Sequence, residues 1–100
     1  MVVGTLVADV LLGDVRSLKQ KRSVVRPIVA ELRRRFGVAA AETGSQDLHR
    51  RLEVGVAVVS STHQHAREVL TACEQSLAEH PEIEVLSVRL RVLDDEDLED

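Results

Sequence analysis

A basic segment at residues 16–22 (RSLKQKR) carries four cationic side chains that could bind an anion. Lys and Arg neutralise phosphates without reading base identity, so a line of cations on a helix is typical of contact with a phosphate backbone. At about 100° per residue, four cations of the helix predicted here fall within about 60° of one another, beside its apolar face. We therefore predict RNA or phosphate contacts at Lys19, Arg22, Arg26 and Arg33, with Arg16 and Lys21 as helpers.

The same stripe has a plainer interpretation, in which long side chains cover the edge of the core and stay solvated. Lys21 falls within the apolar arc if the helix begins at Leu18, so it must snorkel outward or the first turn must deviate. Arg16 precedes the helix N-terminus, where free N–H groups favour an anion. One hypothesis is therefore an enzyme that binds a phosphorylated metabolite in a pocket at Arg16 and Ser17.

Other residues that could carry catalysis have ordinary structural explanations. Cys73 falls on the buried face of a second predicted helix, so we expect a structural thiol. His63 and His65 project about 200° apart on a helix and cannot share one metal ion. The five glycines are isolated, so no glycine-rich phosphate loop is present. We expect no enzyme activity, no metal and no cofactor.

Composition favours one small domain in a cytoplasmic protein. The chain has 100 residues, 44% of them hydrophobic, and its apolar runs break well before the roughly 18 residues that a membrane span needs. The single cysteine fits a reducing compartment. The formal charge of −4 is uneven, because residues 94–100 hold six acids and no base. We expect a domain over residues 1–93 and a disordered acidic tail over residues 94–100.

Hydrophobic periodicity predicts six elements. Strands are expected at residues 2–12, 38–43, about 50–60 and 83–93. One helix is capped by Ser17 and stopped by Gly37, with a kink at Pro27 or a late start near Ser23. A second helix is capped by Ser61 or Thr62 and ends at Pro81. In the last strand, Leu86, Val88, Leu90 and Val92 should face one way, and Ser87, Arg89 and Arg91 the other.

The order β-α-β-β-α-β predicts an α+β, ferredoxin-like fold. Two right-handed crossovers give a four-stranded antiparallel sheet of strand order 4-1-3-2, with both helices on one face. The other face is too apolar to be merely solvated and too polar for a core, which makes it a candidate surface for self-association. Its expected residues are Val3, Thr5, Val7, Glu53, Ala57, Val59, Arg89 and Arg91.

Three motifs carry a resemblance to a known family. Residues 16–22, then Ala41-Glu42 with Asp47-Leu48, then residues 55–60 (GVAVVS) are similar to the YlxP-like family of small bacterial proteins, a domain of unknown function, over about residues 1–93. The resemblance implies a ferredoxin-like fold and a gene that often neighbours translation initiation and ribosome-maturation factors. It implies no catalytic residue. One departure is His49, where relatives often have a tryptophan.

The sequence supports two main functional hypotheses. The first is a non-enzymatic accessory protein that contacts structured RNA or a ribosomal particle through the basic stripe. The alternative is a homodimeric interaction or regulatory module that uses the open sheet face. Phe36 is the only aromatic residue, so base stacking across that face is disfavoured, and any nucleic-acid contact should be with the backbone or by shape.

Overall fold

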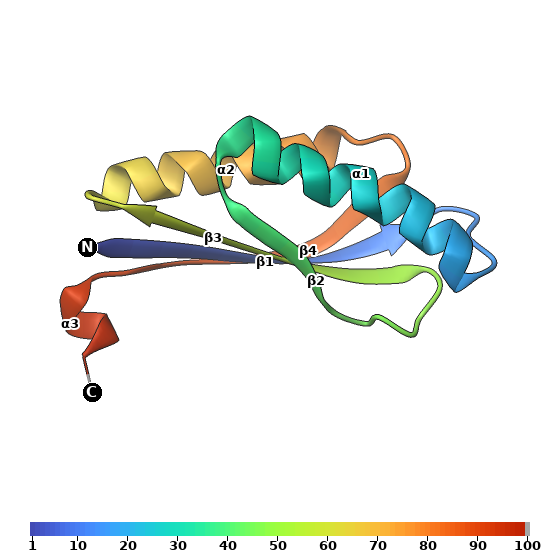
Figure 1. Ribbon diagram of the computed structural model, residues 1–100, viewed down its shortest axis with the longest axis horizontal. Helices are drawn as coiled ribbons and strands as arrows, with labels where there is room; N and C mark the ends of the chain where they lie inside the picture. Colours follow the sequence, from blue (N-terminus) through green and yellow to red (C-terminus); the bar gives the residue numbers. More distant parts are fainter. Residues whose placement is uncertain (100) are drawn as a thin grey trace.

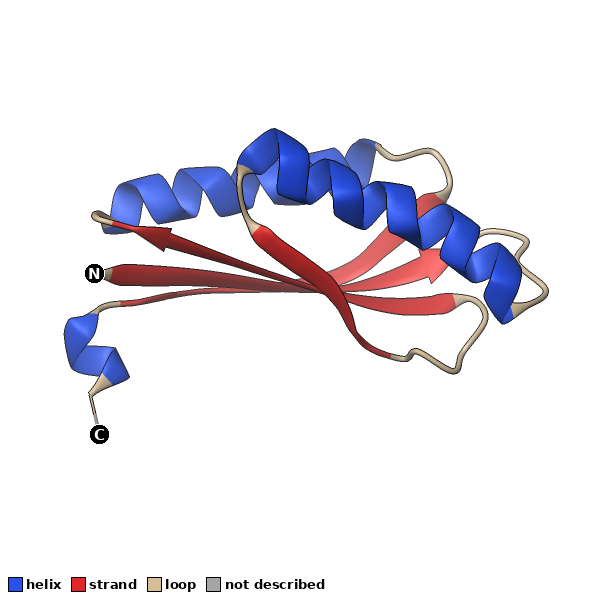
Figure 2. Ribbon diagram, viewed as in Figure 1, coloured by secondary structure: helices blue, strands red, loops and turns tan. Residues whose placement is uncertain are grey.

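Two long helices lie side by side on one face of a four-stranded antiparallel sheet in the computed structural model, which describes residues 1–99 (Figure 1). The opposite face of the sheet carries no helix over most of its length (Figure 2). The predicted ferredoxin-like order is confirmed. The elements are β1 (Val2–Leu12), α1 (Leu18–Phe36), β2 (Ala39–Gly44), β3 (Arg51–Ser60), α2 (His63–Glu79), β4 (Ile83–Leu93) and a short α3 (Asp95–Leu98).

The sheet has the order β2-β3-β1-β4, the reverse reading of the predicted 4-1-3-2. Every neighbouring pair is antiparallel, and β1 is the central strand that pairs with both β3 and β4. Side chains of β1 alternate strictly between buried and partly exposed, because successive residues point to opposite faces. β2 and β4 are the two edge strands.

The core lies between the sheet and the helices. Leu6, Val10 and Leu52 from the sheet, with Leu32 of α1 and Leu70 of α2, have at most 1% of their surface exposed. Packing there is tight at Gly4, where an added Cβ would lie 2.8 Å from Leu70 Cδ1. The helix-facing side of the sheet is therefore close-packed.

α1 keeps its predicted ends. The Ser17 hydroxyl accepts a hydrogen bond of 3.1 Å from the Gln20 N–H, and Gly37 ends the helix with φ +64°. The left-handed φ favours glycine because it has no Cβ. The helix does not start late near Ser23: it begins at Leu18 and is continuous through Pro27.

β4 corrects one part of the predicted pattern. Its register against β1 shifts between Asp9 and Val10, and this β-bulge leaves Leu86 without a direct partner. Leu86 is 44% exposed and does not share the buried side of Val88. The bulge reverses the alternation, so Val85, before it, packs against the core instead.

Within the acidic tail, residues Asp95–Leu98 form the short helix α3. Asp94 caps α3: its carboxylate accepts from the Asp97 N–H, and the Asp97 carboxylate accepts from the Asp94 N–H, both at 3.0 Å. The N-terminal ammonium of Met1 lies 2.9 Å from an Asp95 oxygen and ties the tail to the start of β1. Asp100 lies outside the described residues.

Among residues 1–99, the helices are too short or too polar for any of them to cross a lipid bilayer.

Candidate functional site

A groove of about 510 Å³ lies between α1 and the edge strand β2, and we call it the α1–β2 groove. It brings together three of the four stripe residues predicted from the sequence, all from exposed positions of α1. The arginines flank an apolar floor and a single carboxylate. The lining is Arg22, Arg26, Arg33, Val25, Val29, Ala30, Ala41 and Glu42.

Helix geometry explains why these residues meet. Arg22 and Arg26 are one turn apart, about 6 Å along the axis, and Arg33 follows about three turns after Arg22. Val25 and Val29 are buried on the neighbouring arc, which anchors α1 against the sheet and holds the arginines at the border of the core. The amphipathic pattern therefore places the cations above the edge of β2.

The three arginines have no carboxylate partner within 4 Å among residues 1–99. Arg33 is held by a neutral group, since its Nε donates a hydrogen bond of 2.8 Å to the backbone carbonyl of Ala40. This bond fixes the guanidinium plane and leaves its terminal N–H groups for other acceptors. The groove therefore keeps three positive charges that no internal acid neutralises.

Lys21 corrects the predicted set of phosphate contacts. It does not snorkel: only 2% of its side chain is exposed. Its Nζ donates to the carbonyls of Ser45 at 2.7 Å and Leu48 at 2.8 Å. The same Nζ lies 2.8 Å from Glu42 Oε2 as an ion pair, although the angle is not that of a hydrogen bond. Lys21 is thus a buried clip on the β2–β3 connection and cannot contact a phosphate.

The clip also determines the charge of the groove. Glu42 is the one carboxylate that lines it, and pairing with Lys21 compensates this negative charge. A buried pair of this kind costs desolvation, which its additional hydrogen bonds to carbonyls offset. The consequence is that Glu42 does not compete for the arginines.

Lys19 and Arg16 lie outside the groove. Lys19 is exposed on α1 one turn before Arg22, so it extends the stripe toward the helix start. Arg16 precedes the helix and makes an exposed ion pair with Asp14 at 3.3 Å. The Arg16 N–H donates a hydrogen bond of 2.7 Å to the Gln20 side chain, and the Ser17 hydroxyl accepts one from the Gln20 N–H. The polar groups that could bind an anion at Arg16 and Ser17 are therefore used to cap the helix.

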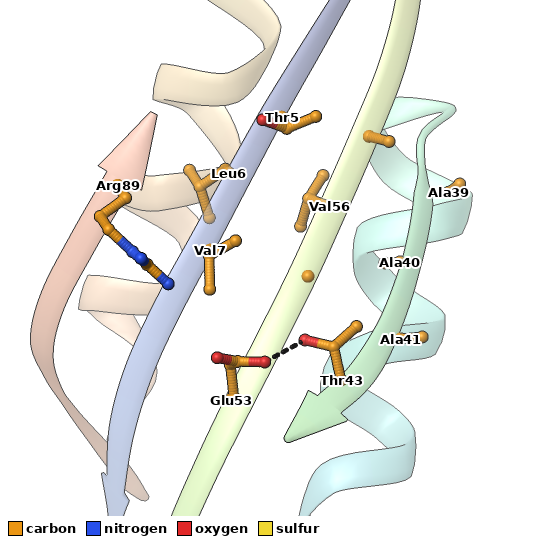
Figure 3. Close-up of a pocket in the computed structure, with 12 residues that line it drawn as sticks. Thr5, Leu6, Val7, Ala39, Ala40, Ala41, Thr43, Glu53, Val56 and Arg89 are labelled. Atoms are coloured by element: carbon orange, nitrogen blue, oxygen red, sulfur yellow. Dashed lines mark hydrogen bonds between the residues drawn. The ribbon is translucent and has the colours of Figure 1, made fainter. Parts of the chain in front are cut away.

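The open sheet face has a second hollow, also of about 510 Å³, which we call the face concavity. Figure 3 shows its small side chains, with Ala39 and Ala41 on β2 and Thr5 and Val7 on β1. Arg89 extends from β4 toward β1 at one end (Figure 3). The residues predicted for this face do lie there, in partly exposed or exposed positions.

The carboxylates of Asp9 and Glu53 on the open face are paired within the sheet. Thr43 Oγ1 on β2 donates a hydrogen bond of 2.7 Å to a carboxylate oxygen of Glu53 on β3, as drawn in Figure 3. Arg51 on β3 makes an ion pair with Asp9 on β1. Cross-strand pairs of this kind stabilise the sheet, and they leave the centre of the concavity apolar.

The residues considered for catalysis have structural surroundings. Cys73 is fully buried on α2, and burial raises the pKa of its thiol to about 11. A thiolate nucleophile is therefore disfavoured there. The Thr62 hydroxyl accepts a hydrogen bond of 3.1 Å from the His65 N–H as the N-cap of α2, and His63 Nε2 lies 3.7 Å from an Asp94 oxygen.

Sequence reasoning missed the second wall of the groove. Nothing local to β2 indicates that Ala41 and Glu42 lie beside α1. Ala30 is a weak sequence signal for this groove, because it is a small residue between Arg26 and Arg33 on the exposed side of α1. A small residue flanked by cations on one helix face is a pattern that could indicate such a floor.

Comparisons with known proteins agree on fold and family. A de novo designed protein with a ferredoxin fold, LFR1 1, solved by NMR, has a TM-score of 0.56 and 14% identity, with 91% of this chain and 85% of the design covered. At that identity the likeness shows the fold alone. The uncharacterized protein YlxP of Bacillus subtilis (strain 168) is 32% identical over 82 residues, which cover 82% of this chain and 89% of the relative.

A family match covers most of the chain. Residues 3–90 match the family described as "Protein of unknown function (DUF503)", and that span includes both α1 and the β2–β3 connection. The YlxP match covers a similar share. The chain therefore belongs to the YlxP-like DUF503 family.

Proposed function

We propose that the chain is a non-enzymatic accessory protein that binds structured RNA or a ribosomal particle through the α1–β2 groove. Arg22, Arg26 and Arg33 supply the phosphate contacts, while Lys19 and Arg16 add charge along the approach. Lys21 is left out because its ammonium is buried. The supporting observation is that three guanidinium groups line one groove and no carboxylate within residues 1–99 pairs with them.

The energetics of such a contact come mainly from released counterions. Each phosphate neutralised on an unpaired strand contributes about 0.7 to the slope of log affinity against log salt. Arginine suits this role because its planar fork matches two phosphate oxygens. Binding should therefore be steeply salt-dependent, although the whole chain has a net charge of −4.

The test is a matched pair of triple variants. Arg22→Ala/Arg26→Ala/Arg33→Ala should lower the affinity for ribosomal RNA at low salt by at least about thirtyfold and reduce the salt slope by about 2. The control, Arg34→Ala/Arg67→Ala/Arg91→Ala, removes the same charge from exposed positions outside the groove. Fluorescence anisotropy measures the affinity, and co-sedimentation with ribosomal subunits checks the natural target.

Two results would refute the proposal. One is the absence of RNA binding at low salt by the unmodified chain. The other is an equal loss in the two triple variants, since binding would then follow net charge and not the groove.

A second candidate function is homodimerisation through the open sheet face. The observation that favours it is the face concavity, with Val59 beside it 68% exposed. Charges of both signs, Asp9 and Glu53 against Arg89 and Arg91, border this face and suit a two-fold contact between copies.

Sedimentation velocity at micromolar concentration tests the dimer. A dimer held by apolar burial should persist at high salt, and Val59→Asp should dissociate it while Ala78→Asp, on exposed α2 surface, should not. A monomer at micromolar concentration would remove this candidate.

A further inference from the structure

The α1–β2 groove is more than a ridge of charge. Between its arginines lies an apolar floor made by Val25, Val29, Ala30 and Ala41. Ala30 is exposed on α1 and presents this floor to the solvent in the free protein, whereas Ala41 borders the groove from β2 with its side chain on the open sheet face. A site that only bound phosphates would gain nothing from an apolar floor, because phosphate oxygens contact cations and N–H groups. The floor indicates a ligand with an apolar part.

The edge of β2 adds a hydrogen-bond donor to the same groove. In an antiparallel strand, the N–H and C=O of one residue point to the same side. The Ala40 carbonyl accepts from Arg33, and the Glu42 carbonyl accepts from Gln46 at 3.3 Å, so both residues direct their backbone groups away from β3. Ala40 is only 5% exposed and does not line the groove, so the backbone N–H of Glu42, which does line it, is the donor that remains there for an acceptor outside the sheet.

The occupied carbonyls also argue against a peptide that extends the sheet. An added strand needs both the donors and the acceptors of the edge that it joins. At β2, the acceptors are capped by side chains of Arg33 and Gln46. The remaining groups mainly donate, and the ligand must therefore be rich in acceptors.

Acceptors, negative charge and a flat apolar part occur together in an unpaired nucleotide. Its phosphates accept from guanidinium groups, its base edge carries carbonyl oxygens and ring nitrogens, and its base face packs on apolar surface or on an Arg plane. A duplex presents its phosphates but keeps the base faces stacked inside. A volume of about 510 Å³ lies within the range of pockets that hold small ligands.

We infer that the α1–β2 groove holds an unpaired nucleotide of an RNA strand. Its base lies on the floor at Ala30, the edge of the base meets the backbone N–H of Glu42, and its flanking phosphates contact Arg22 and Arg26. Arg33, fixed by the Ala40 carbonyl, closes the far end. This inference rests on the proposed function and adds that the groove selects unpaired RNA. The selection comes from the edge of β2 and needs no aromatic stacking.

Two RNA probes and one filling substitution test the inference. The probes are an oligouridine of about twelve nucleotides, which is unstructured, and a blunt duplex with the same number of phosphates. Ala30→Leu fills the groove without changing its charge, and leucine is a good helix former at this exposed position. Ala78→Leu makes the same change on α2, outside the groove.

The oligouridine should bind at least about tenfold more tightly than the duplex, and Ala30→Leu should reduce that preference by about tenfold. Ala78→Leu should leave both affinities unchanged. An unchanged melting temperature of Ala30→Leu shows that the fold is retained, and Ala30→Val serves in its place if that variant does not fold.

Failure of the inference differs from failure of the proposed function. Equal affinity for the two probes, no effect of Ala30→Leu, or equal binding of an oligoglutamate of matched charge overturns the nucleotide site. In that case the proposed function still stands if the Arg22/Arg26/Arg33 triple variant loses ribosomal RNA. If neither RNA probe nor ribosomal RNA binds, the proposed function falls and the inference falls with it.

Discussion

The α1–β2 groove and the face concavity have the same volume, about 510 Å³, and opposite chemistry. Long cationic side chains from a helix surround the first, whereas small side chains from strands line the second. The bordering carboxylates are already engaged at both sites: Glu42 pairs with Lys21, and Asp9 pairs with Arg51. The cations differ in number and in place: in residues 1–99, the groove has three arginines of one helix without an acidic partner, whereas the open face has two such arginines, Arg89 and Arg91, on an edge strand.

Equal volumes do not imply equal ligands, because the lining side chains and their internal pairing decide what a surface can bind. On the open face, Asp9 and Glu53 are already engaged and the lining is mostly apolar, so apolar contact is the main gain that remains. At the groove, the buried clip compensates the one nearby acid, so positive charge remains.

Removal of the clip should have the largest effect. Lys21→Met deletes the ammonium, which leaves the Glu42 carboxylate and the carbonyls of Ser45 and Leu48 without their partner. We expect a loss of about 3 kcal/mol in the free energy of unfolding, measured by urea denaturation. RNA affinity should fall too, because a released Glu42 can pair with the groove arginines.

Lys19→Met is the matched control, since Lys19 is exposed and has no ion-pair partner in residues 1–99. Its unfolding free energy should change by less than about 0.5 kcal/mol. Equal stability of the Lys21 and Lys19 variants would contradict the buried clip.

Two glycines should separate the packed side of the sheet from its open side. Gly4→Ala places a Cβ 2.8 Å from Leu70 Cδ1 in the core and should cost about 2 kcal/mol by overpacking. Gly55→Ala places a Cβ 2.6 Å from Thr43 Cγ2 on the open face, where the exposed Thr43 can turn away at the expense of its hydrogen bond to Glu53, and should cost about 1 kcal/mol. Thermal unfolding of both variants gives the order. The reverse order would mean that the open face is the tighter one.

The bulge in β4 predicts a smaller difference between two neighbours. Val88 contributes to the core, so Val88→Ala should cost about 1 kcal/mol in unfolding free energy. Leu86 is 44% exposed, and Leu86→Ala should cost less than about 0.5 kcal/mol despite the larger truncation. If Leu86→Ala proved the more harmful in urea denaturation, the strand would follow the simple alternation predicted from the sequence.

The acidic tail, which α3 places at the end of the sheet near the start of β1 (Figure 1), gives the smallest effect. The hydrogen bond from the Asp97 N–H lowers the pKa of Asp94 below its ordinary 3.8. Because the pKa of Asp94 is lower in the folded chain than its ordinary value, the ionised carboxylate should stabilise α3 at pH values above 3.8. This stabilisation should be lost as the pH falls through the lowered pKa. The side-chain carboxyl carbon shift of Asp94 in NMR follows this titration, and the stability of α3 in Asp94→Asn should no longer change with pH through protonation at position 94. A midpoint at or above 3.8 would contradict the cap.

Much of the fold could be predicted from periodicity and caps. The alternation in β1, the Ser17 cap and the Gly37 stop are local signals, and each is found in the structure. The exposed helix positions of Arg22 and Arg26 followed from the same 3.6-residue period. Local rules succeed here because neighbouring residues alone determine these features.

The remainder depends on partners that are distant in sequence. Lys21 lies 24 and 27 residues from the carbonyls that bind it, so a helical wheel shows only a cation in an apolar arc. Leu86 is exposed because the β-bulge places one extra residue in β4 opposite β1, and no sequence pattern within β4 indicates this bulge. Ala41 became a groove residue through the packing of α1 over the edge of the sheet.

The bulged β4 has a consequence for the behaviour of the chain at high concentration. As an edge strand of eleven residues, it presents unpaired backbone groups that another copy could use to extend the sheet. Antiparallel pairing of two such strands about Leu90 would set Arg89 of each copy against Arg91 of the other, and the irregularity at Leu86 would interrupt the ladder. Like charges and a broken register both oppose growth of a fibril, so β4 protects the protein against edge-to-edge aggregation.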